Sequence, residues 1–145
     1  MKLFLDTNIV IDFLSGREPF ADDAIALFQL ADNHEVELVV TDLTLVNTVY
    51  VLQRLHYPIE NIYEALYNIR PLINIVTIGE AVIDMCLQRK SGDFEDEAQY
   101  FAAVNAEADY IVTRNKKDFD FGDEAVVTPK ELFSKLNIEI GRAHV

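Results

Sequence analysis

A chain of 145 residues can bury the core of one domain and is too short for two ordinary ones. Its 25 acidic residues against 12 basic ones give a formal net charge of −13, which argues against a protein that coats nucleic acid through a broad basic surface and suits a basic protein partner. The apolar runs are shorter than the roughly 18 residues of a membrane-spanning helix, and the single cysteine, Cys86, cannot form an internal disulfide, so we expect a cytoplasmic protein without a membrane segment.

Five short apolar runs mark the expected strands in chain order: residues 3–5, 38–40, 73–76, 110–112 and 125–127. Each run is apolar almost throughout instead of alternating with polar residues. This pattern is typical of strands that are covered on both faces in a parallel sheet.

Stretches with helical periodicity separate the runs, so the pattern predicts an α/β domain with right-handed crossovers. One apolar stripe consists of Ala24, Leu27, Phe28 and Ala31, and a second of Leu45, Val49, Leu52 and Leu55. Thr128 is expected to cap a last helix that begins at Pro129. Because no linker interrupts the pattern, we predict a single domain over residues 1–140, with a frayed tail at 141–145.

Polar residues follow the expected strands at the edge where such sheets bind their ligands. The exits are Asp6-Thr7-Asn8, Thr41-Asp42, Thr77, Thr113-Arg114-Asn115 and Thr128. Asp6 also has a simpler interpretation, since an aspartate there can cap the helix that follows.

Four acids fall within five residues at Asp93-Phe94-Glu95-Asp96-Glu97. The dipole of a helix start favours such acids by roughly 0.3–1 kcal/mol each, and for Glu95 we expect only this role. The other three share one helix face: Asp93, Asp96 and Glu97. Carboxylates gathered in a cleft need a cation, a raised pKa or solvent, and oxygen-only ligands favour Mg²⁺ or Mn²⁺ over zinc.

Three motifs in this order resemble those of the PIN domain, and most of all those of VapC-type toxins of bacterial toxin–antitoxin pairs. They are Leu-Asp-Thr-Asn-Ile at the start, Asp-Phe-Glu-Asp-Glu-Ala late in the chain, and then Ile-Val-Thr-Arg-Asn-Lys-Lys-Asp-Phe. The resemblance implies a three-layer α/β/α fold with a central parallel sheet of four to five strands. It also implies a metal-dependent endoribonuclease.

Carried over position by position, the catalytic acids of the family fall on Asp6 and Asp96. The fourth catalytic position of the family, which follows Thr-Arg in this chain, falls on Asn115, and Asp118 lies close behind it. The small polar residue of the family's last motif falls on Thr113. The implied ligands of Mg²⁺ or Mn²⁺ are Asp6, Asp96, Asn115 and Asp118, with Asp93 as a helper. Thr7, Asn8, Asn47 and Thr113 would orient ligands and waters, and Arg114, Lys116 and Lys117 would bind phosphates, unless these bases are only solvated surface charges.

The sequence departs from the family pattern at Asn47, where the second acid of the family is usually a glutamate. An asparagine can hold a water or offer its carbonyl oxygen, but it brings no charge. Among possible substitutes, Asp12 lies six residues after Asp6, about 240° around a helix, and so does not share its face.

Three functions follow from these residues. The first is a toxin ribonuclease that hydrolyses RNA with a metal-activated water, forms a homodimer and is silenced by an antitoxin. The second is a PIN-fold binding module with weak or no nuclease activity, because Asn47 and Asn115 replace acids. The third is a phosphatase of the haloacid dehalogenase type with Asp6 as nucleophile, but that chemistry usually needs an acid two residues later, where this chain has Asn8.

Overall fold

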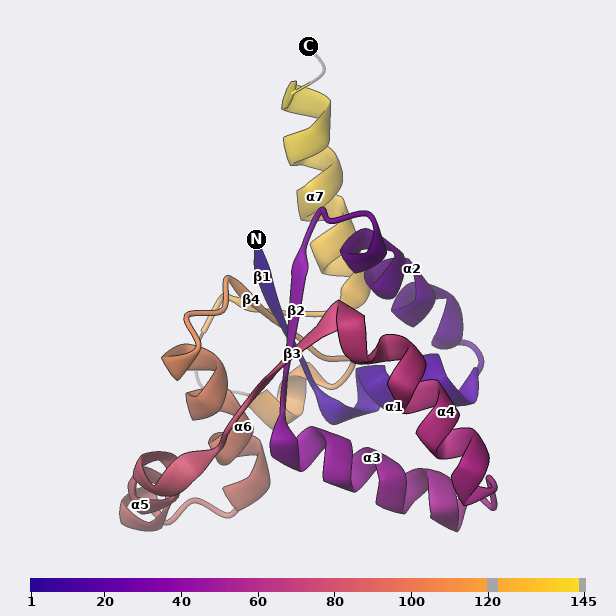
Figure 1. The fold of residues 1–145 in the computed structure, drawn as a ribbon. Helices are drawn as coiled ribbons and strands as arrows, with labels where there is room; N and C mark the ends of the chain where they lie inside the picture. Colours follow the sequence, from indigo (N-terminus) through magenta and orange to yellow (C-terminus); the bar gives the residue numbers. More distant parts are fainter. Residues whose placement is uncertain (120–122, 144–145) are drawn as a thin grey trace.

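A computed structural model, which describes residues 1–119 and 123–143, shows a five-stranded sheet with helices on both faces (Figure 1). The strands are β1 (Lys2–Leu5), β2 (Glu37–Thr41), β3 (Ile73–Val76), β4 (Tyr110–Val112) and β5 (Val126–Val127). The helices are α1 (Thr7–Ser15), α2 (Ala21–Asp32), α3 (Asp42–Arg54), α4 (Ile59–Ile69), α5 (Gly79–Arg89), α6 (Phe94–Asn105) and α7 (Pro129–Ala143). Two 3₁₀ helices are η1 (Arg70–Leu72) and η2 (Lys116–Phe119). The predicted three-layer α/β/α class is confirmed.

The sheet is parallel throughout and has the strand order β3-β2-β1-β4-β5. From β1 the chain moves outward through β2 to β3, and then returns to the other side of β1 for β4 and β5. The strand order therefore switches direction between β1 and β4. In open α/β sheets, the crevice beyond the carboxyl ends of such a pair of strands is the usual ligand site.

Both faces of the sheet are buried along β1, β2, β4 and β5, which explains why these strands are apolar almost throughout, whereas Asn74 and Ile75 of the edge strand β3 are exposed. On β1, Leu3 and Leu5 contact one core and Phe4 contacts the other. The first core lies against α1, α2, α4 and α7, and the second lies against α6, on which α5 packs (Figure 1). The site is therefore built on a central strand that is packed from two sides.

The apolar stripe of α2, which is Ala24, Leu27, Phe28 and Ala31, is buried as predicted. The apolar stripe of α3 differs from the prediction. Of its four expected apolar positions only Leu52 is fully buried, and Leu55 is exposed. Two threonines, Thr44 and Thr48, are completely buried instead. The face of α3 that packs inward is therefore partly polar, because it meets a polar residue of α6.

Helix α7 begins at a reciprocal capping arrangement between Thr128 and Glu131. The Thr128 N–H donates to Glu131 Oε1 at 3.1 Å, and the Glu131 N–H donates to Thr128 Oγ1 at 3.2 Å. This confirms the predicted cap. The helix extends beyond the amino-terminal edge of the sheet (Figure 1). It includes residues 141–143, and the frayed tail stays a prediction. Within the described ranges, no helix is both long and apolar enough to cross a bilayer.

The two-sided core predicts a large penalty for truncating Phe4, whose side chain is completely buried. We expect Phe4→Ala to lower the free energy of unfolding by about 3–5 kcal/mol, since it removes contacts and leaves a cavity. Leu87→Ala, at an exposed position of α5, should change it by less than about 0.5 kcal/mol. Urea denaturation measures both, and equal effects would contradict the burial of the β1 side chains.

Candidate functional site

Asp6 lies where β1 ends, beside the end of β4. Its N–H continues the strand pairing by donating to the Val112 carbonyl at 3.0 Å. Its side chain caps α1, because Oδ1 accepts from the Thr7 N–H at 2.7 Å. The other oxygen, Oδ2, accepts from Thr113 Oγ1 at 2.8 Å. The capping role is thus confirmed, and it holds a largely buried carboxylate at the switch point of the sheet.

Thr113 joins the exit of β4 to that of β1. Its buried hydroxyl donates to Asp6 and accepts from the Asn115 N–H at 3.1 Å. Three of the predicted site residues, Asp6, Thr113 and Asn115, therefore form one hydrogen-bonded unit.

Asn8 contributes an oxygen without a protein partner. Its Oδ1 is buried and accepts no hydrogen bond within residues 1–119 and 123–143. A buried polar atom without a partner is costly and needs an explanation, such as a water or an ion. Asn8 lies in the first turn of α1, two residues after Asp6.

Asp96 lies in the first turn of α6 and is half-buried. Gln99 follows three residues later on the same face of the helix. The buried Gln99 carboxamide donates through Nε2 to Thr44 Oγ1 at 3.0 Å, and its Oε1 accepts from Thr41 Oγ1 at 2.9 Å. The face of α6 that carries Asp96 is therefore directed toward the start of α3.

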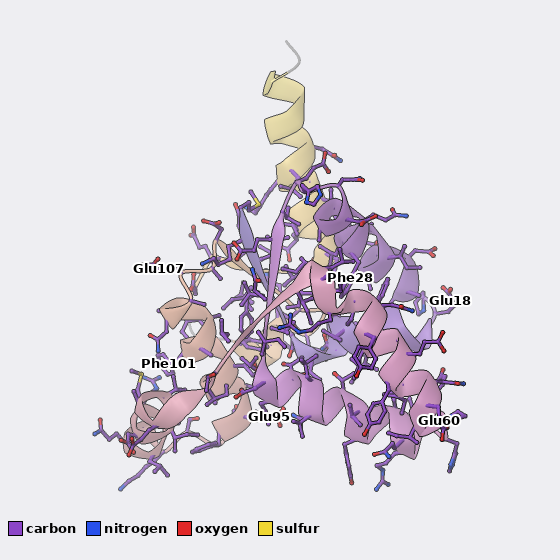
Figure 2. All side chains as sticks on the ribbon, viewed as in Figure 1. Glu18, Phe28, Glu60, Glu95, Phe101 and Glu107 are labelled. Carbon is purple, nitrogen blue, oxygen red and sulfur yellow. The ribbon has the colours of Figure 1, made fainter. Side chains whose placement is uncertain are left out.

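Asn47 lies in α3, one turn after Thr44, and it contacts an acid of α6. Its Nδ2 donates to Glu95 Oε1 at 3.0 Å. Figure 2 shows Glu95 beside the start of α3. Glu95, which we expected to serve only the helix terminus, thus lies against the position where the family usually has a carboxylate.

The acidic cluster does not act as one group. Glu97 is buried and accepts hydrogen bonds from Ser91 Oγ, at 2.7 Å, and from Arg89 Nε of α5. The bonds from Ser91 and Arg89 lower the pKa of Glu97. Asp93 is exposed and precedes α6 without a capping bond from its side chain. In the described part of the chain, no three His, Cys, Asp or Glu residues gather closely enough to hold a metal ion.

Arg114, expected to bind phosphate, lies against a buried acid of α1. Its Nε and Nη2 donate to the two oxygens of Asp12, at 2.8 and 3.3 Å. Its guanidinium lies over the ring of Phe20, 4.1 Å from the centroid. Asp12 is completely buried, and Arg17 approaches it to 3.9 Å. The ion pair with Arg114 neutralises the charge of the buried Asp12 carboxylate on α1.

The other bases line an open pocket of about 460 Å³ beside the exit of β4. Its lining residues are Arg114, Asn115, Lys116, Lys117 and Thr128. Lys116 forms an ion pair with Glu131 at 3.1 Å, and Lys117 is exposed. The side chain of Asp118 lies outside the described residues. The phosphate-binding roles of these bases stay predictions.

The donor atoms at the switch point fit a hard divalent cation. The Asp6 carboxylate oxygens accept from the Thr7 N–H and from Thr113 Oγ1, and two residues later the buried Asn8 Oδ1 has no hydrogen-bond partner in the part of the chain that the structure describes. Mg²⁺ and Mn²⁺ prefer such oxygens, and Mg²⁺ is usually held by only one or two carboxylates, with waters and substrate phosphates completing its shell.

Sequence reasoning missed the threonines and Gln99 that connect α1, α3 and α6. Thr7 Oγ1 lies 3.1 Å from Thr44 Oγ1, which in turn contacts Gln99. The spacing of Thr44 and Thr48, four residues apart on one face of α3, was the available signal.

Residues 2–117 match the sequence profile described as PIN domain. The sequence has no significant match among curated proteins. Among solved structures, a toxin–antitoxin complex from Klebsiella pneumoniae has a TM-score of 0.65 at 23% identity, covering 88% of this chain and 97% of that one. VapBC2 from Rickettsia felis, bound to a DNA fragment from its promoter, has a TM-score of 0.64 at 17% identity, covering 88% and 98%. VapC20 of Mycobacterium tuberculosis, a toxin that cleaves the sarcin–ricin loop, has a TM-score of 0.59 at 10% identity, covering 75% and 86%. These likenesses are of fold.

Glu131 gives the site a pH-dependent anchor for α7. Hydrogen bonds from the Thr128 backbone and from Lys116 lower the pKa of its carboxyl group. The ionised form is therefore favoured in the folded chain, and its stabilisation is present above the unfolded pKa of about 4.5 and is lost as pH falls through the lower folded pKa. We expect Glu131→Gln to be less stable than the wild type at pH 7, with a difference that disappears in acid.

Urea midpoints between pH 7 and pH 3 measure this difference. The glutamine keeps an acceptor for the Thr128 N–H, so the comparison isolates the charge. Glu64→Gln, at an exposed position of α4, is the matched control. A difference between wild type and Glu131→Gln that stays constant down to pH 3 would show that the carboxylate charge does not stabilise this end of α7.

Proposed function

The chain belongs to the PIN domain family, and on that premise we propose that it is a Mg²⁺- or Mn²⁺-dependent ribonuclease, the toxin of a toxin–antitoxin pair. The observation that carries the proposal is the bond between Asp6 and Thr113, which fixes a carboxylate in the crevice where the strand order switches. Structures of similar fold that are described as a toxin–antitoxin complex and as a toxin support it.

In the proposed mechanism, Asp6 and Asp96 would hold the ion, with the oxygens of Asn8 and Asn115 as additional donors and Asp118 as a further candidate. A bound ion would supply an activated water and stabilise negative charge on the scissile phosphate. Thr7 and Thr113 would keep the Asp6 carboxylate in one orientation, since each donates to a different oxygen of it.

RNA must reach this crevice on a chain of formal net charge −13. The exposed Lys117 and the pocket beside the exit of β4 supply the positive charge next to the acids. The ion itself would screen the remaining repulsion between the carboxylates and the phosphate. The proposal therefore needs only a local basic surface.

For partners, we propose a homodimer and an antitoxin. Exposed tyrosines on α3 and α4 support an apolar contact surface: Tyr50, Tyr63 and Tyr67 are 59%, 55% and 78% exposed. The chain's net negative charge suits a basic antitoxin segment. One of the similar structures is described as a toxin–antitoxin complex, and another as VapBC2 bound to a DNA fragment from its promoter.

The competing function is a PIN-fold module that binds RNA or protein without cleaving it. The specific observation in its favour is that Asn47 brings no charge and directs its amide hydrogens to Glu95. Fewer fixed carboxylates mean a weaker hold on a divalent ion. The two functions differ in whether the protein binds Mn²⁺ and cleaves RNA.

Replacement of either proposed ligand tests the enzyme directly. We expect Asp6→Asn and Asp96→Asn to lower RNA cleavage in Mn²⁺ by at least about 100-fold, because each removes a charge that holds the ion. EDTA should abolish wild-type cleavage. Asp32→Asn, at the exposed end of α2, should leave the rate unchanged.

A panel of structured and single-stranded RNAs, analysed on sequencing gels, measures these rates. Cleavage that persists in EDTA would overturn the metal mechanism. Absence of both cleavage and Mn²⁺ binding at millimolar concentrations, by calorimetry, would favour the binding module.

A second prediction concerns the neutral residue at position 47. We expect Asn47→Glu to bind Mn²⁺ at least about tenfold more tightly than the wild type, because it adds a carboxylate beside the proposed ligands. Without the ion, the same carboxylate would face Glu95, and two like charges about 4 Å apart cost about 1 kcal/mol in water.

We therefore expect Asn47→Glu to unfold at a lower temperature than the wild type in EDTA and to regain stability when Mn²⁺ is added. Asn47→Gln keeps the neutral amide and serves as the control. Calorimetric titration and thermal unfolding measure the two properties. Equal Mn²⁺ affinities of the glutamate and glutamine variants would mean that position 47 does not face the ion.

A further inference from the structure

We propose that Thr44 is a positioning residue, whose hydroxyl holds α6 against α1 and so fixes the position of Asp96 relative to Asp6. The inference rests on the proposed function for its catalytic consequence. Neither the sequence motifs nor the family resemblance points to Thr44, which lies inside α3.

The hydroxyl of Thr44 lies where three structural elements meet. Its oxygen is 3.1 Å from Thr7 Oγ1 in α1, 3.2 Å from Thr41 Oγ1 at the cap of α3, and 3.0 Å from Gln99 Nε2 in α6. Thr41, Thr44 and Gln99 are all at most 1% exposed. One buried atom therefore connects the two helices that carry the proposed ligands.

The distances allow one consistent direction for these hydrogen bonds. The single proton of Thr41 is assigned to Gln99 Oε1, which is 2.9 Å away and closer than Thr44. Gln99 Nε2 then donates to Thr44, and the Thr44 proton is left for Thr7. This assignment fixes the orientation of the Gln99 carboxamide, because its two ends are held by partners of opposite type.

Both ends of this network lead to a proposed ligand. Thr7 follows Asp6 directly and donates its N–H to Asp6 Oδ1. Gln99 lies one turn after Asp96 on the same face of α6. A rotation or shift of α6 that moved Asp96 would thus also disturb the bonds of Gln99.

A second threonine of α3 shows what a buried hydroxyl does without this role. Thr48 is also completely buried, one turn after Thr44, and its Oγ1 donates to the Thr44 carbonyl at 2.7 Å within the same helix. Removal of that bond affects α3 alone. Thr48 is therefore a matched control that differs from Thr44 in whether its hydroxyl contacts other elements.

The test compares Thr44→Val with Thr44→Ser and Thr48→Val in the whole chain. In Thr44→Val we expect the kcat of RNA cleavage and the Mn²⁺ affinity each to fall about 10- to 100-fold, with the KM for RNA nearly unchanged. Thr44→Ser keeps the hydroxyl and Thr48→Val keeps the contacts between elements, so both should stay within about threefold of the wild type.

Amide hydrogen exchange supplies a measurement that does not depend on activity. The first turns of α6, residues 94–99, should exchange faster in Thr44→Val and not in Thr48→Val. If Thr44→Val does not fold, Gln99→Leu replaces it, since it removes the same link from the α6 side and predicts the same changes.

The outcomes separate this inference from the proposed function. Equal exchange and equal Mn²⁺ affinity in Thr44→Val and Thr48→Val would overturn the role of Thr44, even if the wild type cleaves RNA. A wild type that neither binds Mn²⁺ nor cleaves RNA would overturn the proposed function. For such an inactive wild type, faster amide exchange of α6 in Thr44→Val but not in Thr48→Val would still support the link between α6 and α1. Unchanged exchange in both variants would reject that link.

Discussion

The hydrogen bond between Thr113 and Asp6 depends on the parallel pairing of β1 with β4, and the rest of the site depends on that bond. Paired strands end together, so the first residue after each lies beside the other. A carboxylate at this junction would be costly to bury alone. It is stable there because a helix start and a neighbouring hydroxyl both donate to it.

Much of this arrangement was predictable because it follows from local rules. Apolar runs fixed the five strands, and the polar exits placed Asp6 and Thr113 at the same edge before any contact was known. The cap at Thr128 followed from one residue type beside Pro129. Each of these inferences needs only the nearest residues and the general geometry of parallel sheets.

The predictions that were wrong concern side chains whose partners are distant in the sequence. The stripe of α3 was expected to be apolar, but the buried Gln99 lies opposite it and pairs with threonines. Glu95 was assigned to the helix dipole, since nothing nearby in the sequence reveals its contact with Asn47, 48 positions away. Polar pairs between residues far apart in the sequence leave little periodic signal, because hydrophobic periodicity is read over a short stretch that contains only one of the two partners.

The pairing of Arg114 with Asp12 has a consequence for how a polyanion would approach this protein. A guanidinium that already neutralises a buried acid is not available to neutralise a phosphate and so to release counterions from the nucleic acid, and it cannot leave Asp12 without stranding a buried charge. Lys116 is similarly engaged with Glu131. Association with RNA should therefore release few ions and respond weakly to added salt, unlike that of proteins with an open basic face. The weak salt dependence follows from bases that are already paired within the fold.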